Sequence, residues 1–202
     1  MKYKKTIVVS IFLLIFMPSF LWAEEPGKII METVDRGLAI LKDPSLQGEK
    51  KTEDYRQKLW EEISPIFNFE EMSKRALARH WRKLSPEEKS EFVKLFTDHL
   101  RSAYIGKAFT YSGEKIVYLR EKQDNNYAKV QTKVILNTGK GMLVDFNMHN
   151  NHGKWKIYDV IIEGVSLVNN YRSQFNSFLI NSSYEELIQK IKEKIQGMNI
   201  NK

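Results

Sequence analysis

The four histidines of this chain are the side chains best suited to acid–base or metal chemistry near neutral pH. His149 and His152 flank a predicted turn as H-N-N-H, and two imidazoles three residues apart could share a metal ion. No carboxylate or third histidine has a matching spacing, so a solvated turn is the favoured interpretation. His80 and His99 lie on or beside the apolar faces of expected helices. There we expect core or boundary histidines with satisfied hydrogen bonds.

Two aspartates within expected strands are the next candidates for chemistry. Asp159 lies between Tyr158 and Val160, so it should be partly buried, and a buried carboxylate needs a partner. Arg172, one turn into the following helix, is the predicted partner. The resulting ion pair would fix the corner between strand and helix, which makes a structural role more favoured than a general base. Asp145 is the other carboxylate that could serve a pocket.

Nucleophiles and phosphate-binding loops give no better candidate. Ser166 lies in G-V-S-L-V, which lacks the second glycine of a nucleophile elbow, and it fits a helix N-cap instead. The sequence has no glycine-rich phosphate loop and no basic–aromatic pattern typical of nucleic-acid modules. It contains no cysteine, which excludes thiol chemistry, zinc–thiolate sites and disulfides. We therefore expect no catalytic residue, no metal site, no cofactor and no nucleic-acid partner.

The N-terminus is typical of a secretory signal peptide. Three lysines among the first five residues precede an apolar run at 6–16, and a small residue follows at Ala23. The run is shorter than the roughly 20 residues that span a bilayer. We predict cleavage after Ala23, a signal peptide at 1–23 and one domain at 24–202. Cleavage would remove three positive charges from the formal charge of +7, which leaves a mildly basic chain suited to an anionic surface, an acidic partner or simply solvent.

The first half of the remaining chain has the apolar spacing of helices. Asn68 with Glu71, and Ser85 with Glu88, are predicted capping boxes at two of the helix starts. The expected helices are 29–41, 52–63, 68–81 and 85–103.

From residue 113 the apolar period changes to two, which predicts strands joined by short turns. Ser166 begins a further helix to about residue 180, and Ser183 with Glu186 caps a last helix to about residue 196. The predicted fold class is α+β, a curved four-stranded antiparallel meander sheet with helices packed on one face, as an NTF2-like cone enclosing an apolar cavity. The expected strands are 115–122, 127–137, 142–149 and 155–162.

The stretch at 155–179 combines a strand, a turn at Gly164 and a helix, and almost every core-facing position in it is large and apolar or aromatic. No reactive group accompanies it. Apolar pockets with few polar groups are typical small-molecule sites. This pattern favours a binder of apolar material over an enzyme.

Two blocks of this sequence resemble the MlaC family, also called the toluene-tolerance auxiliary transport (Ttg2-type) family of periplasmic phospholipid-binding proteins. One is F-N-F-E-E-M-S-K-R-A-L-A-R-H-W-R-K-L-S-P-E-E-K-S-E-F-V-K-L-F at 67–96, and the other is W-K-I-Y-D-V-I-I-E-G-V-S-L-V-N-N-Y-R-S-Q-F at 155–175. The second block is highly specific, and the resemblance covers essentially the whole chain. One departure is Ala78-Arg79, where many relatives carry a glycine before the position of Trp81.

The resemblance implies a monomeric periplasmic carrier, not an enzyme, that holds a diacyl glycerophospholipid by its acyl tails between sheet and helices. The implied partners are an outer-membrane lipoprotein–porin complex and an inner-membrane ABC transporter with an MCE-type subunit. The implied role is to maintain outer-membrane lipid asymmetry. The residues expected to line the lipid cavity are Leu100, Tyr104, Val130, Val134, Leu143, Phe146, Tyr158, Val160, Val165, Val168, Tyr171, Phe175 and Phe178.

Two alternatives stay open at the level of sequence. An NTF2-like enzyme acting on an apolar substrate would need a pocket carboxylate with a raised pKa, and Asp159 or Asp145 would have to supply it. A ligand-free periplasmic adaptor would dock through a basic surface, and it predicts a filled core.

Overall fold

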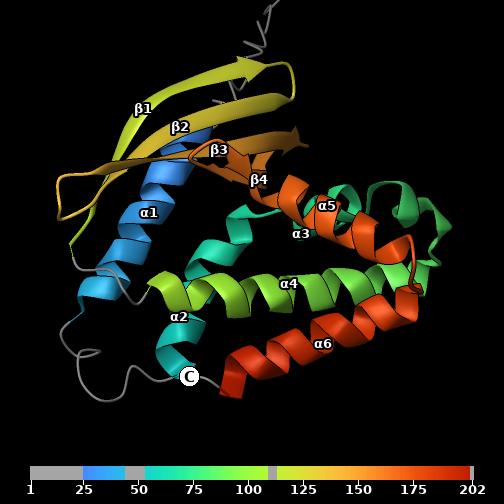
Figure 1. Ribbon diagram of the computed structural model, residues 1–202. Helices are drawn as coiled ribbons and strands as arrows, with labels where there is room; N and C mark the ends of the chain where they lie inside the picture. Colours follow the sequence, from blue (N-terminus) through green and yellow to red (C-terminus); the bar gives the residue numbers. More distant parts are fainter. Residues whose placement is uncertain (1–24, 44–52, 109–112, 201–202) are drawn as a thin grey trace, which may run out of the picture.

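The computed structural model describes residues 25–43, 53–108 and 113–200 (Figure 1). The predicted signal peptide at 1–23 lies outside the described residues. Within them, no helix combines the length and the apolar character needed to cross a bilayer.

The sheet is open and antiparallel, and its strands follow chain order: β1 (Lys115–Asp124), β2 (Tyr127–Ile135), β3 (Gly141–Asn151), β4 (Lys154–Ile162) and β5 (Val165–Ser166). The predicted meander is confirmed, but the count of four strands is wrong, because β5 pairs with the end of β4. Glu163 and Gly164 both have positive φ and reverse the chain within two residues. A two-residue strand shows no period of two, so the sequence did not reveal it. The likeness to NTF2-like cones remains a prediction.

Two bulges decide which side chains face the helices. In β1 the extra residue is Leu119, and in β4 it is Tyr158, which lies between the partners of Asn147 and Met148. Because a bulge inserts one unpaired residue, the alternation of faces shifts by one there. Ile157 on one side of the bulge and Val160 on the other therefore both belong to the helix-facing side of the sheet.

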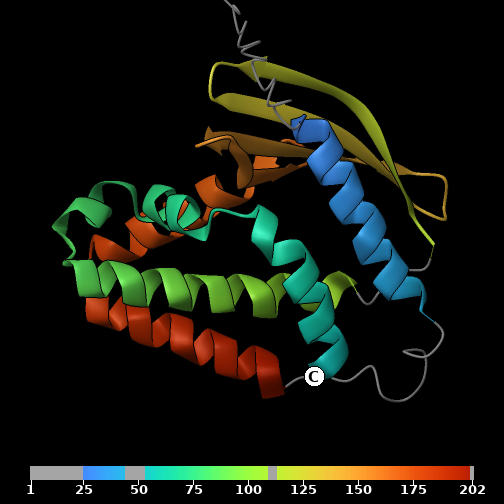
Figure 2. The same cartoon turned by 180° about the vertical axis from the view of Figure 1, so that it is seen from behind.

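Six α-helices and two short 3-10 turns are described, and they cover one face of the sheet (Figures 1 and 2). The helix α1 crosses beneath β1 and β2, where Gly27 N–H donates to Glu121 Oε2 at 2.7 Å. Figure 1 shows α4 and α6 side by side, running in the same direction, in the layer farthest from the sheet. The elements are α1 (Pro26–Lys42), α2 (Glu53–Ile63), η2 (Ser64–Ile66), α3 (Phe69–Leu77), η3 (Ala78–Lys83), α4 (Pro86–Ala108), α5 (Leu167–Leu179) and α6 (Tyr184–Ile200).

The predicted N-caps are confirmed, but the box predicted for Asn68 and Glu71 is not reciprocal, because the Asn68 N–H donates to the carbonyl oxygen of Ile157 instead of to Glu71. Asn68 and Ser166 each accept a backbone N–H through the side chain, from Glu71 and Asn169 respectively. Ser85 and Glu88 form a reciprocal capping box, as do Ser183 and Glu186. Each cap satisfies backbone donors that have no partner inside their own helix, which is why these short polar signals locate helix starts so well.

Two apolar clusters hold the layers together. The larger joins α3, α4, α5 and α6, with Phe92 and Phe96 fully buried and the edge of each ring against Phe175. The smaller joins α1 to the sheet through Ile30 and Val130. The space between these clusters, under β3 and β4, is where the fold leaves room for a cavity.

The predicted helix 68–81 is corrected at its C-terminal end. The α-helix stops at Leu77, and Ala78 adopts φ 48° and ψ −116° before a 3-10 turn carries the chain to Lys83. This backbone conformation favours glycine, because a Cβ is crowded there. Ala78 is one of the two residues noted above as a departure from a glycine, and its backbone angles are ones that glycine would adopt without a steric penalty.

We predict that Ala78→Gly stabilises the protein by about 1 kcal/mol, since glycine adopts this conformation without a steric penalty. Urea unfolding at pH 7 should give a higher midpoint with an unchanged slope. Ala76→Gly is the matched control: Ala76 is buried inside the regular part of α3, so the same substitution should destabilise by about 1 kcal/mol or more. A lower midpoint for Ala78→Gly would show that the methyl group contributes more than the strain costs.

Candidate functional site

An apolar cavity of about 230 Å³ lies between the helix-facing side of the sheet and the helices α2, α3 and α4. Its twelve lining side chains come from six elements and from the link before α3. No charged side chain is among them, so within the described residues the cavity offers an almost purely hydrocarbon surface. The lining residues are Trp60, Ile63, Phe67, Phe69, Met72, Leu100, Tyr104, Ile105, Phe146, Val160, Ile162 and Leu167.

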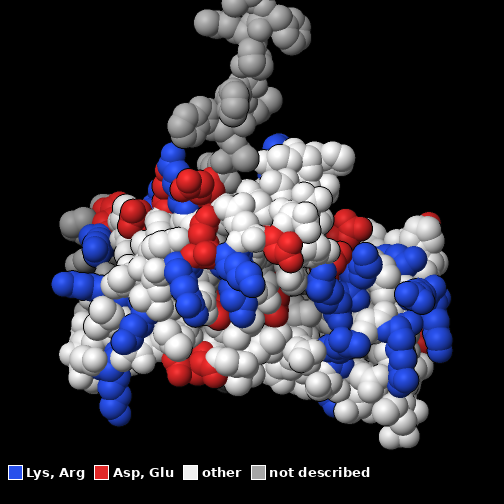
Figure 3. Space-filling view, turned by 90° about the horizontal axis from the view of Figure 1, so that it is seen from above, with Lys and Arg blue, Asp and Glu red and all other residues white. Residues whose placement is uncertain are grey.

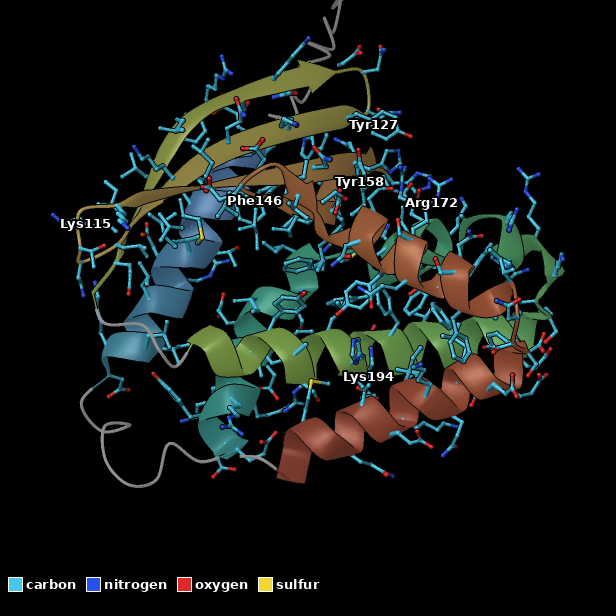
Figure 4. The ribbon with its side chains drawn as sticks, in the orientation of Figure 1. Lys115, Tyr127, Phe146, Tyr158, Arg172 and Lys194 are labelled. Carbon is cyan, nitrogen blue, oxygen red and sulfur yellow. The ribbon has the colours of Figure 1, made fainter. Side chains whose placement is uncertain are left out.

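The sheet wall of the cavity is set by strand register. Phe146 in β3 pairs with Val160 in β4, and Ile162 is the next residue of β4 on the same face. Figure 4 shows Phe146 beneath the sheet, in the space above α4. Because paired residues project to the same side, this register brings an aromatic and two branched aliphatic side chains together as a continuous apolar wall.

The helix wall is held by aromatic packing at the start of α3. The rings of Phe67 and Phe69 stack with centroids 5.6 Å apart, and Trp60 lies 5.4 Å from Phe69. Asn68 N–H donates to the carbonyl oxygen of Ile157 at 2.8 Å, which ties this corner to β4. The corner therefore has a fixed place on the sheet, while the rings beside it shape the cavity.

Polar chemistry in the cavity is limited to the Trp60 indole N–H and the Tyr104 hydroxyl. Tyr104 is already hydrogen-bonded to Tyr171, and burial together with Tyr104 raises the pKa of Tyr171. The Tyr104 hydroxyl is therefore already engaged in a hydrogen bond with another side chain. The lining can exclude water and pack hydrocarbon, and it offers no group for acid–base catalysis.

Four of the thirteen residues predicted to line the site meet at this cavity: Leu100, Tyr104, Phe146 and Val160. The other nine lie elsewhere. The two apolar clusters bury Val130, Val168, Tyr171 and Phe175. Half-buried positions are those of Val134 and Phe178, and exposed positions are those of Leu143 and Val165. The other side of the sheet carries Tyr158.

Strand facing explains the main differences between the predicted lining and the residues found at this cavity. Leu143 pairs with Lys133 and is 47% exposed, so it lies on the outer face, whereas Val134 pairs with Met142 on the inner face. Tyr158 is the bulge residue of β4, and its ring lies under the guanidinium of Arg75 at 4.1 Å, away from the cavity. A bulge has no clear sequence signal, and a one-residue slip inverts every facing after it.

Eight lining residues were not among those predicted. Five of them lie between residues 60 and 72, where aromatic and aliphatic residues cluster on both sides of Pro65. That cluster is a sequence signal that could have identified these five. The eight are Trp60, Ile63, Phe67, Phe69, Met72, Ile105, Ile162 and Leu167.

Asp159 is buried, as predicted, but its partners differ from the prediction. Its Oδ2 accepts from the Ser166 hydroxyl at 2.6 Å, and its Oδ1 accepts from the Val168 N–H at 3.0 Å. Within the described residues Arg172 forms no ion pair with it. The first turn of α5 presents free N–H groups and a positive dipole end, which suits a carboxylate better than a long, solvated arginine does.

Asp145 also has structural partners. The amide of Gln131 donates to its Oδ2 at 3.0 Å, and Lys129 Nζ lies 3.5 Å from the same oxygen. All three residues project from the outer face of the sheet, on the side opposite the cavity. Neither aspartate lines the cavity, so the pocket carboxylate that an enzyme would need is missing from its described lining.

The prediction of satisfied hydrogen bonds fits His80, but it is wrong for His99, whose buried Nδ1 has no hydrogen-bond partner among the described residues. His80 Nε2 lies 3.2 Å from Asn176 Oδ1, and the ring of His149 packs 4.8 Å from that of Tyr127 at the end of the sheet. His152 has positive φ in the tight turn before β4. No cluster of three or more metal-ligating side chains occurs among the described residues.

His99 is the buried member of this group. Its Nε2 lies 3.0 Å from the Tyr171 hydroxyl, and burial, reinforced by the nearby charge of Lys194, lowers its pKa from 6.5 to about 4. As the pH falls below 6.5, His99 binds a proton in the unfolded chain but not in the folded chain. We predict that this residue costs up to about 3 kcal/mol of stability between pH 6.5 and pH 4.

Urea unfolding of wild type and His99→Gln at neutral pH and near pH 4 checks this prediction. Glutamine keeps a polar group toward Tyr171 but does not titrate, so the variant should lose less stability on acidification than wild type. Equal losses in the two proteins would mean that other groups carry the acid sensitivity.

A larger hollow of about 620 Å³ lies at the end of the β1–β2 hairpin, and its lining is of a different kind. It includes Arg120, Glu121, Lys122, Asp124 and Lys129, with both signs of charge represented. Figure 3 looks down on the sheet and shows basic and acidic side chains intermixed over it. A mixed, solvated surface of this kind does not suit hydrocarbon, so the smaller apolar cavity is the better candidate site.

Comparisons with known proteins agree with this geometry. Residues 31–193 match the family model described as MlaC protein. The chain is 25% identical over 137 residues to the intermembrane phospholipid transport system binding protein MlaC of Haemophilus influenzae, covering 65% of this chain and 64% of that protein, just under two thirds of its length. It is 26% identical over 155 residues to the toluene tolerance protein ttg2D of Pseudomonas putida, covering 76% of this chain and 72% of that protein.

A solved structure has the same fold. The phospholipid-binding protein of Ralstonia solanacearum, determined in complex with a phospholipid, superimposes with a TM-score of 0.78 at 23% identity, covering 87% of this chain and 99% of that one. The family model spans most of the described residues, including the elements that build the cavity. This chain therefore belongs to the MlaC family.

Proposed function

We propose that this chain binds a diacyl glycerophospholipid by its acyl tails in the apolar cavity. The observation that carries the proposal is the lining: twelve described side chains from sheet and helices, none of them charged, enclose one space. Membership of the MlaC family and a fold shared with a protein solved in complex with a phospholipid support it. In this proposal the headgroup stays near solvent, and the tails occupy the space beside Phe146 and Val160.

Loading must widen the cavity. Its 230 Å³ fall below the ~300–1,000 Å³ of typical ligand sites, and a lipid with two tails is a large ligand. The described arrangement is therefore the contracted state in this proposal. Widening would separate the aromatic corner at Trp60 and Phe69 from the helix α4, and the tails would replace contacts between these walls.

We further propose that the chain is a periplasmic carrier, exported by the signal peptide at 1–23 and working as the single domain 24–202. It would move lipid between an outer-membrane lipoprotein–porin complex and an inner-membrane ABC transporter with an MCE-type subunit, and so maintain outer-membrane lipid asymmetry. Moving tails through water costs about 0.8 kcal/mol for each methylene, so an aqueous gap calls for an enclosed apolar carrier. A cavity of similar polarity to the bilayer lets loading and release stay nearly balanced.

The two alternatives have less support. An enzyme on an apolar substrate needs a titratable group at the reacting atoms, and the described lining contains no carboxylate or histidine. A ligand-free adaptor predicts a filled core, whereas an apolar cavity separates the two packed clusters here.

Native mass spectrometry of the purified mature protein, with solvent extraction of what it carries, tests the proposed function. We expect an added mass that extracts as a diacyl phospholipid. A protein that arrives empty and also fails to load from phospholipid vesicles would overturn the carrier proposal and favour the adaptor.

A further inference from the structure

A second hollow, of about 390 Å³, opens between α5 and α6 on the side of α4 away from the lipid cavity. It shares no lining residue with that cavity. The helix α4 lies between the two spaces: its residue His99 lines the hollow, and the next residue, Leu100, lines the lipid cavity. A ligand in this hollow would therefore occupy a site of its own.

The lining of the hollow is graded from apolar to cationic. Phe175, Leu187 and Ile191 are buried and form its apolar floor. Lys190 and Lys194 are exposed at its rim, and neither forms a salt bridge among the described residues. Lys190 Nζ lies 4.6 Å from the ring centroid of Phe178, which also lines the hollow. Figure 4 shows Lys194 between α4 and α6. Two cations above an apolar floor are the complement of a small amphiphile with an anionic head.

The buried wall of the hollow contains an unsatisfied polar atom. His99 is only 6% exposed, and its Nε2 is engaged by Tyr171 at 3.0 Å. Its Nδ1 is buried and has no hydrogen-bond partner among the described residues. Leaving a buried polar atom without a hydrogen bond costs free energy. A ligand that forms a hydrogen bond with His99 Nδ1 would therefore remove this cost. When Tyr171 donates to Nε2, Nδ1 carries the ring proton and can donate to an anion.

We propose that this α5–α6 hollow binds a medium-chain monocarboxylate. Its carboxylate would lie near Lys190 and Lys194 and accept a hydrogen bond from His99 Nδ1–H, and its alkyl chain would cover Phe175, Leu187 and Ile191. A single short chain fits the size of the hollow, and one carboxylate matches its two cations and single buried donor. This site is independent of the lipid cavity.

Octanoate is the probe, titrated into tag-free protein that retains whatever lipid it co-purifies with. With only four histidines in the chain, the imidazole signals of His99 can be followed by NMR. We expect a saturable shift of the His99 signals below about 1 mM octanoate, and a loss of affinity of about tenfold in Lys190→Glu/Lys194→Glu. Lys192→Glu is the matched control, since Lys192 lies on the same helix, pairs with Glu91 and does not line the hollow.

The outcomes separate this site from the lipid cavity. Val160→Trp, which blocks that cavity, should leave the octanoate shift of His99 unchanged, and Lys190→Glu/Lys194→Glu should leave the co-purified lipid unchanged. The proposal is overturned if His99 does not respond to octanoate, if Lys192→Glu weakens binding as much as the double variant does, or if Val160→Trp alone abolishes the response. Both lysines are solvated, so the double variant is expected to fold, and a thermal melt checks it.

Discussion

Val160→Trp should yield a folded protein that carries no phospholipid. Val160 lines the cavity from β4, opposite Phe146 in the neighbouring strand. An indole in place of the valine would fill much of the 230 Å³ and extend toward the aromatic corner at Phe69. Because the cavity is already smaller than a typical ligand site, we expect the co-purified lipid to fall by roughly 90% or more. The larger side chain enters empty space, so the cost in stability should be small.

Leu143→Trp is the matched control for this prediction. It places the same indole on the adjacent strand, but Leu143 is 47% exposed on the outer face. Lipid extraction and native mass spectrometry should find wild-type lipid in Leu143→Trp and almost none in Val160→Trp, with similar thermal melts. Wild-type lipid content in both variants would place the tails somewhere other than this cavity. Val168→Trp is unsuitable, because Val168 is a buried core residue and a larger side chain there would overpack the core.

Local signals in the sequence predicted most of the fold, because the causes are local. The capping boxes at Ser85 and Ser183 depend on residues three positions apart, and both are present in the structure. The turns at Gly139 and Gly153 adopt the positive φ that a tight hairpin needs. Elements defined by a neighbouring cap or turn can be located without knowledge of what packs against them.

The cavity lining was harder to predict, because it depends on three-dimensional register. The bulge at Tyr158 moves this residue off the cavity face, and only pairing with β3 reveals the bulge. Val168 and Phe175 have the same apolar character as Leu100, yet they do not line the cavity and instead pack in the cluster that α5 forms with α3, α4 and α6. Hydrophobicity predicts that a side chain is buried, but not which of two adjoining apolar spaces it enters.

The prediction for Asp159 shows the same limit: the sequence indicated burial and the need for a partner, while the structure supplied a different partner. Its carboxylate holds the Ser166 hydroxyl and the Val168 N–H, so it ties the end of β4 to the first turn of α5. We expect Asp159→Ala to destabilise the protein by about 3 kcal/mol, because two charge-assisted hydrogen bonds disappear and a buried N–H is left unpaired. Since α5 contributes Leu167 to the cavity, lipid content should fall as well.

Urea unfolding at pH 7 separates this account from the ion pair with Arg172. Ser166→Ala should cost about 1–2 kcal/mol, because it removes one partner of Asp159 and also the N-cap hydroxyl that accepts from Asn169. Arg172→Ala should stay within about 0.5 kcal/mol of wild type, as expected for an exposed side chain that forms no ion pair with any described residue. If Arg172→Ala instead destabilised as much as Asp159→Ala, and Ser166→Ala had no effect, the arginine would be the true partner. We therefore expect Asp159→Ala to destabilise most, Ser166→Ala less and Arg172→Ala least. The Asp159 carboxylate accepts a hydrogen bond from a backbone N–H in the first turn of α5, which has no acceptor inside the helix, whereas the exposed Arg172 side chain can be hydrated by solvent.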